Sequence, residues 1–345
     1  MIYLLLHTMS YSVAMSQFAL SFGLYLQSIV PAVNQHLAAA ALLTLLYAMN
    51  LTGPKSAARL NKAISLVLFA GLGAFILFGL PKVDFSVIFS IENLFPNGPF
   101  LFISTLALLS SATAGAQFIA ELGGEAKDAG RTIPRVMIFA TFAVGIVYVL
   151  IALVAAGVLP IAEVANQPLT LVAQTIMPKA ILYLFVIGSA LGGTATALNS
   201  SMSWITKPVL VACDDGMLPR SFGSVSSKGV PYKLLTFFYI VAMLPLVSGV
   251  NITTITKFTT ANSLLCKLLV CIALFVLAQQ HGKILERSTL KITPENAKIL
   301  SIVGILILCI LSYSLFANLS AAVVVSLVLL IGFSILHSRI FCKGI

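Results

Sequence analysis

A run of small and hydroxyl side chains interrupts the apolar stretch 99–121. The run reads SSATAGAQ, and its candidate ligand-binding residues are Ser110, Ser111, Thr113, Ala114, Gly115 and Gln117. Many secondary transporters bind substrates near the bilayer midplane, with backbone groups that a broken membrane helix leaves free. Small residues also let two helices approach closely. The residues alone therefore leave two interpretations open, a substrate site at a broken helix and a tight packing face.

A second polar face ends the apolar stretch 170–205, in the sequence TATALNSSMS. A Gly-x-x-x-Gly pattern that begins at Gly188 precedes it, and this spacing is typical of closely packed membrane helices. Thr196, Asn199 and Ser200 stand at i, i+3 and i+4, so they share one side of a helix, and this face can meet a ligand. Hydrogen bonds between helices are the alternative. The candidate ligands are Asn199, Ser200 and Ser201.

Two ionisable side chains fall inside apolar stretches. Lys267 lies about 12 residues, or ~18 Å, from the end of its stretch that is predicted to be cytoplasmic. That is too far for easy snorkelling, and intramembrane lysines usually face the bundle interior. We interpret Lys267 as a cation that contacts the site or carries a coupling proton; the alternative is an uncompensated lysine in a protein no longer under selection. His7 is predicted to be a hydrogen-bonded packing residue.

The elements that must position these residues are membrane helices. The 345-residue chain is 59% hydrophobic and 9% charged, with a mean hydropathy of +1.07. About 20 apolar residues match the ~30 Å hydrocarbon core. No loop is long enough for a soluble domain, so residues 1–345 are predicted to form one all-α, polytopic membrane domain. The predicted spans are 1–26, 35–50, 61–80, 99–121, 134–158, 170–205, 232–249, 254–279, 298–316 and 319–338.

The basic residues predict the orientation of these spans. Sixteen of the 20 Lys and Arg residues lie in one set of loops, three lie in the opposite set, and Lys267 lies within a span. By the positive-inside rule the larger set is cytoplasmic, so both termini are predicted to be cytoplasmic. Because the basic residues form short clusters between spans, the net charge of +10 does not indicate nucleic-acid binding. The spacing of the Cys, His, Asp and Glu residues predicts no enzyme, cofactor or metal site.

The loop after the interrupted span mixes acidic, basic and turn residues, as GGEAKDAGRTIPR. Two glycines can end the preceding helix, and Pro134 is expected in the first turn of the next. The basic residues set the topology. The interleaved acids would also let the loop pair internally and act as a hinge or gate. The residues of this motif are Glu125, Lys127, Asp128, Arg131, Pro134 and Arg135.

This order of residues resembles the segment after the broken sixth span of amino-acid/polyamine/organocation (APC) superfamily permeases. There a glycine, here Gly115, precedes E-x-K-N-P-x-R-x-I-P-R; Asp128 and Ala129 replace the usual Asn and Pro. Two further segments agree in order. DDGMLP with GVP resembles the loop after the eighth span, and NLTGPK resembles the loop after the fourth.

The resemblance implies a LeuT-like transporter fold of two inverted five-span repeats, with substrate held between spans one and six. The first span here then corresponds to family span three, and two spans are expected to be missing. Ser10, Tyr11 and Phe18 match site-facing positions, with ordinary packing as the alternative. Ser111 replaces the aromatic gate of the basic amino-acid exchangers and Gln117 replaces their acid, which favours a small, neutral or zwitterionic substrate.

The predicted function is therefore secondary transport of amino acids or related amines by alternating access, as a permease or antiporter. The predicted location is the inner membrane of a bacterium. The coupling ion, a proton or Na⁺, is left open. The alternative is a truncated or split permease without independent activity, which would need a separate N-terminal fragment as partner.

Overall fold

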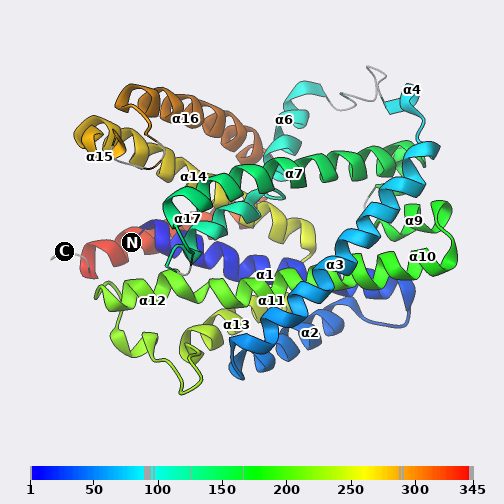
Figure 1. The fold of residues 1–345 in the computed structure, drawn as a ribbon, viewed down its shortest axis with the longest axis horizontal. Helices are drawn as coiled ribbons and strands as arrows, with labels where there is room; N and C mark the ends of the chain where they lie inside the picture. Colours follow the sequence, from blue (N-terminus) through cyan, green and yellow to red (C-terminus); the bar gives the residue numbers. More distant parts are fainter. Residues whose placement is uncertain are drawn as a thin grey trace. The chain divides into compact units, whose positions relative to one another are not determined.

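The computed structural model describes residues 2–88, 95, 98–124, 126–165, 167–286, 289 and 291–341, some of them through their backbone only. This part of the chain is helical and contains no strand (Figure 1). A helix lies at each of the ten predicted spans. The long elements are α1 (Ile2–Ile29), α2 (Gln35–Leu51), α3 (Pro54–Gly79), α6 (Gly98–Leu109), α7 (Ala129–Gly157), α11 (Gly192–Trp204), α13 (Tyr232–Val247), α14 (Ile252–Gln280), α16 (Pro294–Phe316) and α17 (Ala321–Phe341).

Shorter elements connect or extend these helices. The α-helical ones are α4 (Phe85–Ile88), α8 (Ile161–Val164), α9 (Thr170–Ile176), α10 (Lys179–Tyr183), α12 (Thr206–Asp214) and α15 (Gly282–Glu286). Three are 3₁₀ turns or helices: η1 (Leu80–Lys82), η2 (Ala114–Leu122) and η4 (Arg220–Gly223). One, η3 (Leu184–Leu191), is a π-helix.

Among the described residues, six helical segments are long and apolar enough to cross a membrane: Ile64–Lys82, Gly98–Glu121, Ala129–Gly157, Lys179–Asp214, Ile252–Gln280 and Pro294–Phe316. Helix α1 has 28 residues but is not one of them, because it carries many polar side chains. Those of His7, Ser10, Ser12 and Ser16 are all buried. This helix therefore turns its polar residues toward protein rather than toward lipid.

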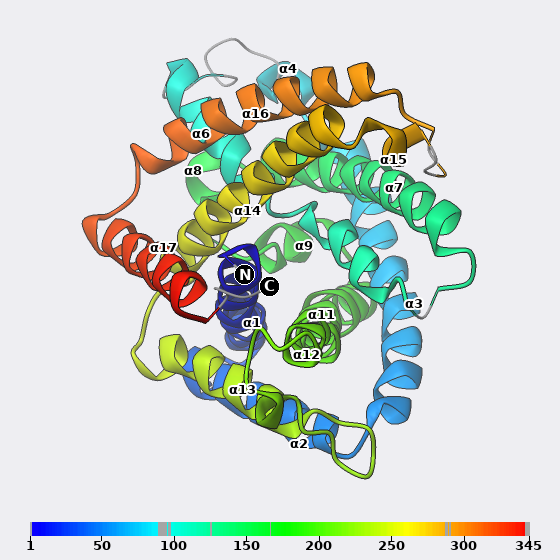
Figure 2. The same ribbon diagram turned by 90° about the vertical axis from the view of Figure 1, so that its left-hand side faces the viewer.

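The chain divides into two compact units. The first comprises Met1–Ser10, Asn97–Ala143 and Thr256–Ile345. Within it, α16 lies along α6 (Figure 2). Its apolar core is built by α6, α14, α16 and α17. The buried residues of this core are Ala107, Ala261, Leu264, Leu315, Val323 and Leu327.

The second unit comprises Tyr11–Pro96 and Val144–Ile255. Within it, α2 lies beside α13, and α3 lies against η3 and α11 (Figures 1 and 2). The stacked rings of Phe75 and Phe185, with centroids 5.1 Å apart, join α3 to η3 at the centre of an apolar core. Gly188 and Gly192 face Val67 and Ile64 of α3 so closely that a methyl group would collide. The predicted close-packing role of this pair is confirmed.

Two boundaries differ from the predictions. Helix α7 begins at Ala129, so Pro134 is its sixth residue and does not lie in the first turn. The turn before it, with Asp128 at φ 49°, starts the helix early, and the Asp128 carbonyl accepts the amides of Arg131 and Thr132. The stretch 170–205 is interrupted at Met177, whose extended backbone precedes Pro178, because a residue before proline disfavours the helical region.

Candidate functional site

The predicted break in the span 99–121 is present. Helix α6 ends at Leu109, residues 110–113 form turns, and η2 continues as a nine-residue 3₁₀ helix. The amide of Ser110 still donates to the carbonyl four residues earlier, at 3.0 Å, whereas those of Ser111 and Ala112 donate three residues back. Such a change of helix type inside a span often marks a hinge or a functional site.

The hydroxyl groups of the run explain why the α-helix stops. Ser110 donates to the Ala107 carbonyl and Ser111 to the Leu108 carbonyl, each at 2.7 Å. Thr113 donates to the Ser110 carbonyl at 3.4 Å. Serine and threonine side chains that bond nearby carbonyls compete with the helical ladder. Three of the predicted site residues therefore shape the backbone of the break.

Gly115 faces open space in its own unit. A methyl group added to it would meet nothing within 4 Å, and the residue is exposed. Ala114, beside it, and Gln117, one turn further along η2, are half-buried. Close packing therefore explains Gly188 but not Gly115, whose backbone is accessible.

Lys267 reaches the break from α14. Its Nζ donates to the Ser110 carbonyl at 3.4 Å, and the side chain is half-buried. Among the residues that the structure describes, no carboxylate lies within ion-pair distance of this ammonium group. The break therefore combines an accessible backbone with a positive charge that has no acidic partner in this part of the chain.

A second charged contact joins α1 to η2, and the sequence did not reveal it. His7 Nε2 lies 2.6 Å from Glu121 Oε1, with the two side chains 4% and 16% exposed. His7 is buried and hydrogen-bonded, as expected, but its partner was not foreseen. The available signal was that Glu121 alone, of ten acidic residues, falls within a predicted span.

The three candidates on α1 have different surroundings. The hydroxyl of Ser10 is buried and donates to the Thr259 carbonyl of α14 at 3.2 Å. In the other unit, the ring of Tyr11 lies edge-on to that of Trp204, with centroids 5.2 Å apart. Phe18 is half-buried. Ser10 and Tyr11 thus take part in helix contacts, the alternative left open by the sequence.

The polar face of α11 forms a network with α2 and α3. The Asn50 amide donates to the Asn199 carbonyl oxygen at 2.7 Å, and the Asn199 amide donates to Asn61 at 3.1 Å. Asn61 in turn donates to the Ser200 hydroxyl at 2.9 Å. The hydroxyl of Ser201 donates within its own helix, to the Ala197 carbonyl. This network matches the helix–helix interpretation of the face.

Part of the loop motif can be placed. Glu125 lies outside the described residues. Lys127 and Asp128 lie in the turn before α7, and Arg131, Pro134 and Arg135 lie near the start of that helix. No ion pair links the described residues of this loop. Three glycines of the other motifs, Gly53, Gly216 and Gly229, have φ of 119°, 76° and 78°. Side chains rarely adopt such backbone, so glycine is required at these turns.

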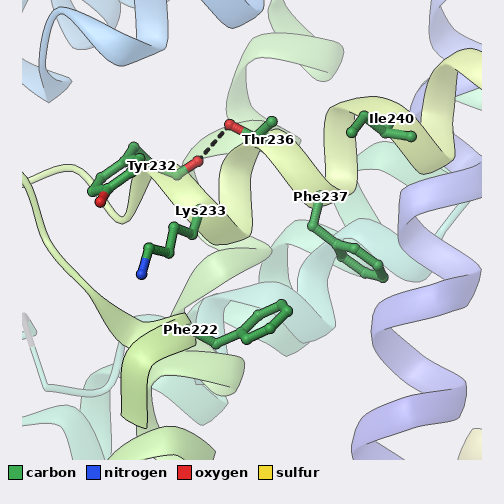
Figure 3. A pocket seen from close by; sticks show the side chains of 6 residues that line it. All are labelled: Phe222, Tyr232, Lys233, Thr236, Phe237 and Ile240. Carbon is green, nitrogen blue, oxygen red and sulfur yellow. Dashed lines mark hydrogen bonds between the residues drawn. The ribbon is translucent and has the colours of Figure 1, made fainter. Parts of the chain in front are cut away.

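A shallow pocket of about 420 Å³ lies at the start of α13 (Figure 3). None of the predicted site residues lines it, and Lys233 Nζ donates to the Ser221 carbonyl nearby at 2.8 Å. Within the described residues, no group of three His, Cys, Asp or Glu side chains could hold a metal ion. The lining residues are Phe222, Tyr232, Lys233, Thr236, Phe237 and Ile240.

Comparison with known families decides the class of protein. Residues 1–336 match the family described as "Amino acid permease". The chain belongs to this family. Together with the six apolar helices among the described residues, this makes it a polytopic integral membrane protein. The predicted APC resemblance and the polytopic helical transporter fold are confirmed.

Individual relatives share between a quarter and a third of their aligned residues with this chain. "Amino-acid permease RocE" of Bacillus subtilis is 29% identical over 218 residues, 60% of this chain and 44% of the relative. "Branched-chain amino acid permease BcaP" of the same organism is 27% identical over 52% of this chain and 38% of its own length. The "Cadaverine/lysine antiporter" of Escherichia coli is 29% identical over 43% of this chain and 34% of its own length. The chain thus spans less than half the length of these three relatives.

Proposed function

We propose that this protein is a secondary transporter of amino acids or related amines that works by alternating access. The observation that carries the proposal is the break between α6 and η2, which has an open backbone at Gly115 and a lysine at Ser110 that has no acidic partner among the described residues. Half-helix ends and unwound backbone are the groups with which such transporters bind ions and zwitterions. The relatives named as permeases and as an antiporter support the same function.

The proposed substrate is small and neutral or zwitterionic. Its ammonium group would be bound by carbonyl groups of the break, and its carboxylate would pair with the ammonium of Lys267. Ser111 and Gln117 provide neither an aromatic lid nor a negative charge, which disfavours a second positive group on the substrate. Phe18 remains a proposed site-facing residue. Ser10, Tyr11, Asn199, Ser200 and Ser201 enter the proposal as residues that hold helices in place.

Lys267 has two proposed roles, contact with the site and transfer of a coupling proton. Its hydrogen bond to the Ser110 carbonyl supports the first. The location in a bacterial inner membrane, the cytoplasmic termini and a separate N-terminal fragment as partner remain predictions. Co-expression with such a fragment, followed by purification on a tag carried by only one of them, tests the last of these.

The proposal is tested by counterflow in proteoliposomes loaded with unlabelled amino acids. The chain should exchange a labelled neutral amino acid from outside at a saturable rate. A valine at Gly115 fills the open space at the break, so Gly115→Val should lower exchange by about tenfold or more, the effect of a loss of ~1.4 kcal/mol in binding. Gly332→Val is the matched control, since Gly332 is also helical and exposed with nothing within 4 Å. Equal exchange by both variants would contradict the proposed site.

A further inference from the structure

The buried pair of His7 and Glu121 is a chemical group that the proposed substrate site does not use. Its nitrogen and oxygen lie 2.6 Å apart. The second carboxylate oxygen, Oε2, is buried and has no hydrogen-bond partner among the described residues. A carboxylate inside a membrane protein is costly unless it is paired or protonated, and such residues commonly belong to proton relays.

Two aromatic rings lie beside the imidazole of this pair. The ring of Tyr3 stacks on that of His7 with centroids 5.2 Å apart, and the ring of Phe118 lies 6.2 Å away. Among the described residues, the titratable groups around the pair are the Tyr3 phenol on α1, an electrostatic neighbour of Glu121, and beyond it the Cys266 thiol on α14, an electrostatic neighbour of Tyr3. Phenols and thiols are ordinarily uncharged at neutral pH. The nearby ammonium of Lys267 is bonded to the Ser110 carbonyl instead.

The position of the pair ties it to the break. Glu121 lies on η2, the segment that directly follows the turns at 110–113, and His7 lies on α1. The pair therefore anchors η2 to a neighbouring helix. In alternating access, the elements around the binding site rock or change partners in each cycle. Movement of η2 relative to α1 in such a cycle would open and close the contact between His7 and Glu121.

We infer that His7 and Glu121 form the proton-binding site that couples this transporter to the proton gradient, an inference that rests on the proposed transport function. In the closed pair one proton is held between Nε2 and Oε1, which lie 2.6 Å apart. When the pair opens to water, this proton leaves to that side. Reclosure takes up one proton from the side that is then open, so one proton crosses per cycle.

The experiment uses the full chain in proteoliposomes, with an entrapped pH dye and a labelled neutral amino acid. A gradient of one pH unit supplies about 1.4 kcal/mol per proton and supports about tenfold accumulation. The wild type should accumulate substrate to that extent and move protons with it. Glu121→Gln and His7→Gln should exchange substrate at a reduced rate. They should lose both the accumulation driven by the pH gradient and the proton movement that accompanies it. Glu163→Gln and His281→Gln change exposed groups of the same types and serve as controls.

The outcomes separate coupling from structure. If the variants melt earlier but keep gradient-driven accumulation, the pair is only a structural contact and the inference is overturned. The exchanged pair His7→Glu with Glu121→His keeps the contact, so it should recover stability and part of the coupling. A wild type that exchanges substrate in counterflow, but whose net uptake is neither driven by the pH gradient nor accompanied by protons, overturns the inference alone. Absence of any counterflow overturns the proposed function as well.

Discussion

Replacement of Lys267 by methionine tests the charge at the break. The hydrogen bond from Nζ to the Ser110 carbonyl is long, at 3.4 Å, so its loss costs little, on the order of the ~0.6 kcal/mol average for bonds inside membrane proteins. Removal of a buried ammonium group offsets this cost. Because Thr113 also donates to this carbonyl, the carbonyl keeps a partner. We therefore expect the stability of Lys267→Met to change by less than about 1 kcal/mol.

The same substitution should weaken substrate binding much more. A hydrogen bond to a charged group contributes about 1.5–3 kcal/mol, which corresponds to about a ten- to hundredfold rise in apparent KM. Lys267→Arg keeps the charge, so its apparent KM should lie between that of the wild type and that of Lys267→Met. Lys257→Met is the matched control, because Lys257 lies on the same helix and also donates to a carbonyl, that of Asn318, at 3.5 Å.

The assay is the concentration dependence of counterflow, with thermal unfolding in detergent as the measure of folding. Equal KM values for Lys267→Met and Lys257→Met would refute the role of Lys267 in carboxylate binding. The pH dependence of transport separates the two proposed roles of this lysine. A Lys267→Ala variant with a raised KM but the wild-type pH profile across pH 5–8 would exclude the coupling role alone, and a variant that matches the wild type in both would exclude both roles.

Three further predictions concern stability, each measured by thermal unfolding in detergent. Asn199→Ala removes two hydrogen bonds between helices, so it should destabilise the protein by about 1–3 kcal/mol. Ser201→Ala is the control and should change stability little, because the Ser201 hydroxyl donates to the Ala197 carbonyl of its own helix. Equal effects of the two substitutions would contradict the network. Gly188→Val collides with α3 and should cost about 1–3 kcal/mol through overpacking, whereas Gly145→Val, with open space around it, should not. Asn34→Ala removes the cap that accepts two amides at the start of α2 and should cost about 1 kcal/mol; no loss would show that α2 does not depend on it.

Most of the fold could be predicted from hydropathy, because a bilayer forces apolar stretches of defined length to be helical. The break at 110–113 was one of the two interpretations that the run of small and hydroxyl residues left open, and a tight packing face was the other. The early start of α7 could not be predicted. It depends on the backbone conformation of Asp128 rather than on the preference of Pro134 for the first turn of a helix. The interruption between α9 and α10 follows from Pro178. Hydropathy does not reveal it, because the stretch 170–205 is apolar on both sides of this proline.

The candidate site was predictable only in part, because side-chain partners are a property of tertiary structure. Asn199 and Ser200 have the composition of a ligand site, yet they bond to Asn50 and Asn61, residues about 140 positions away. The sequence showed the single acid in a span but could not pair Glu121 with His7, 114 residues earlier. Spacing along one helix reveals shared faces. It does not reveal which other helix each face meets.

The central claim, that the break between α6 and η2 is the substrate site, is tested most directly by cysteine accessibility. In a variant without native cysteines, Ala112→Cys places a thiol on an exposed residue of the break, and Phe139→Cys places one on the exposed apolar face of α7. A water-soluble maleimide should label residue 112 and not residue 139, and a transported amino acid should slow the labelling. A break that labels at the same rate with and without substrate, in a protein that still exchanges it, would contradict the account.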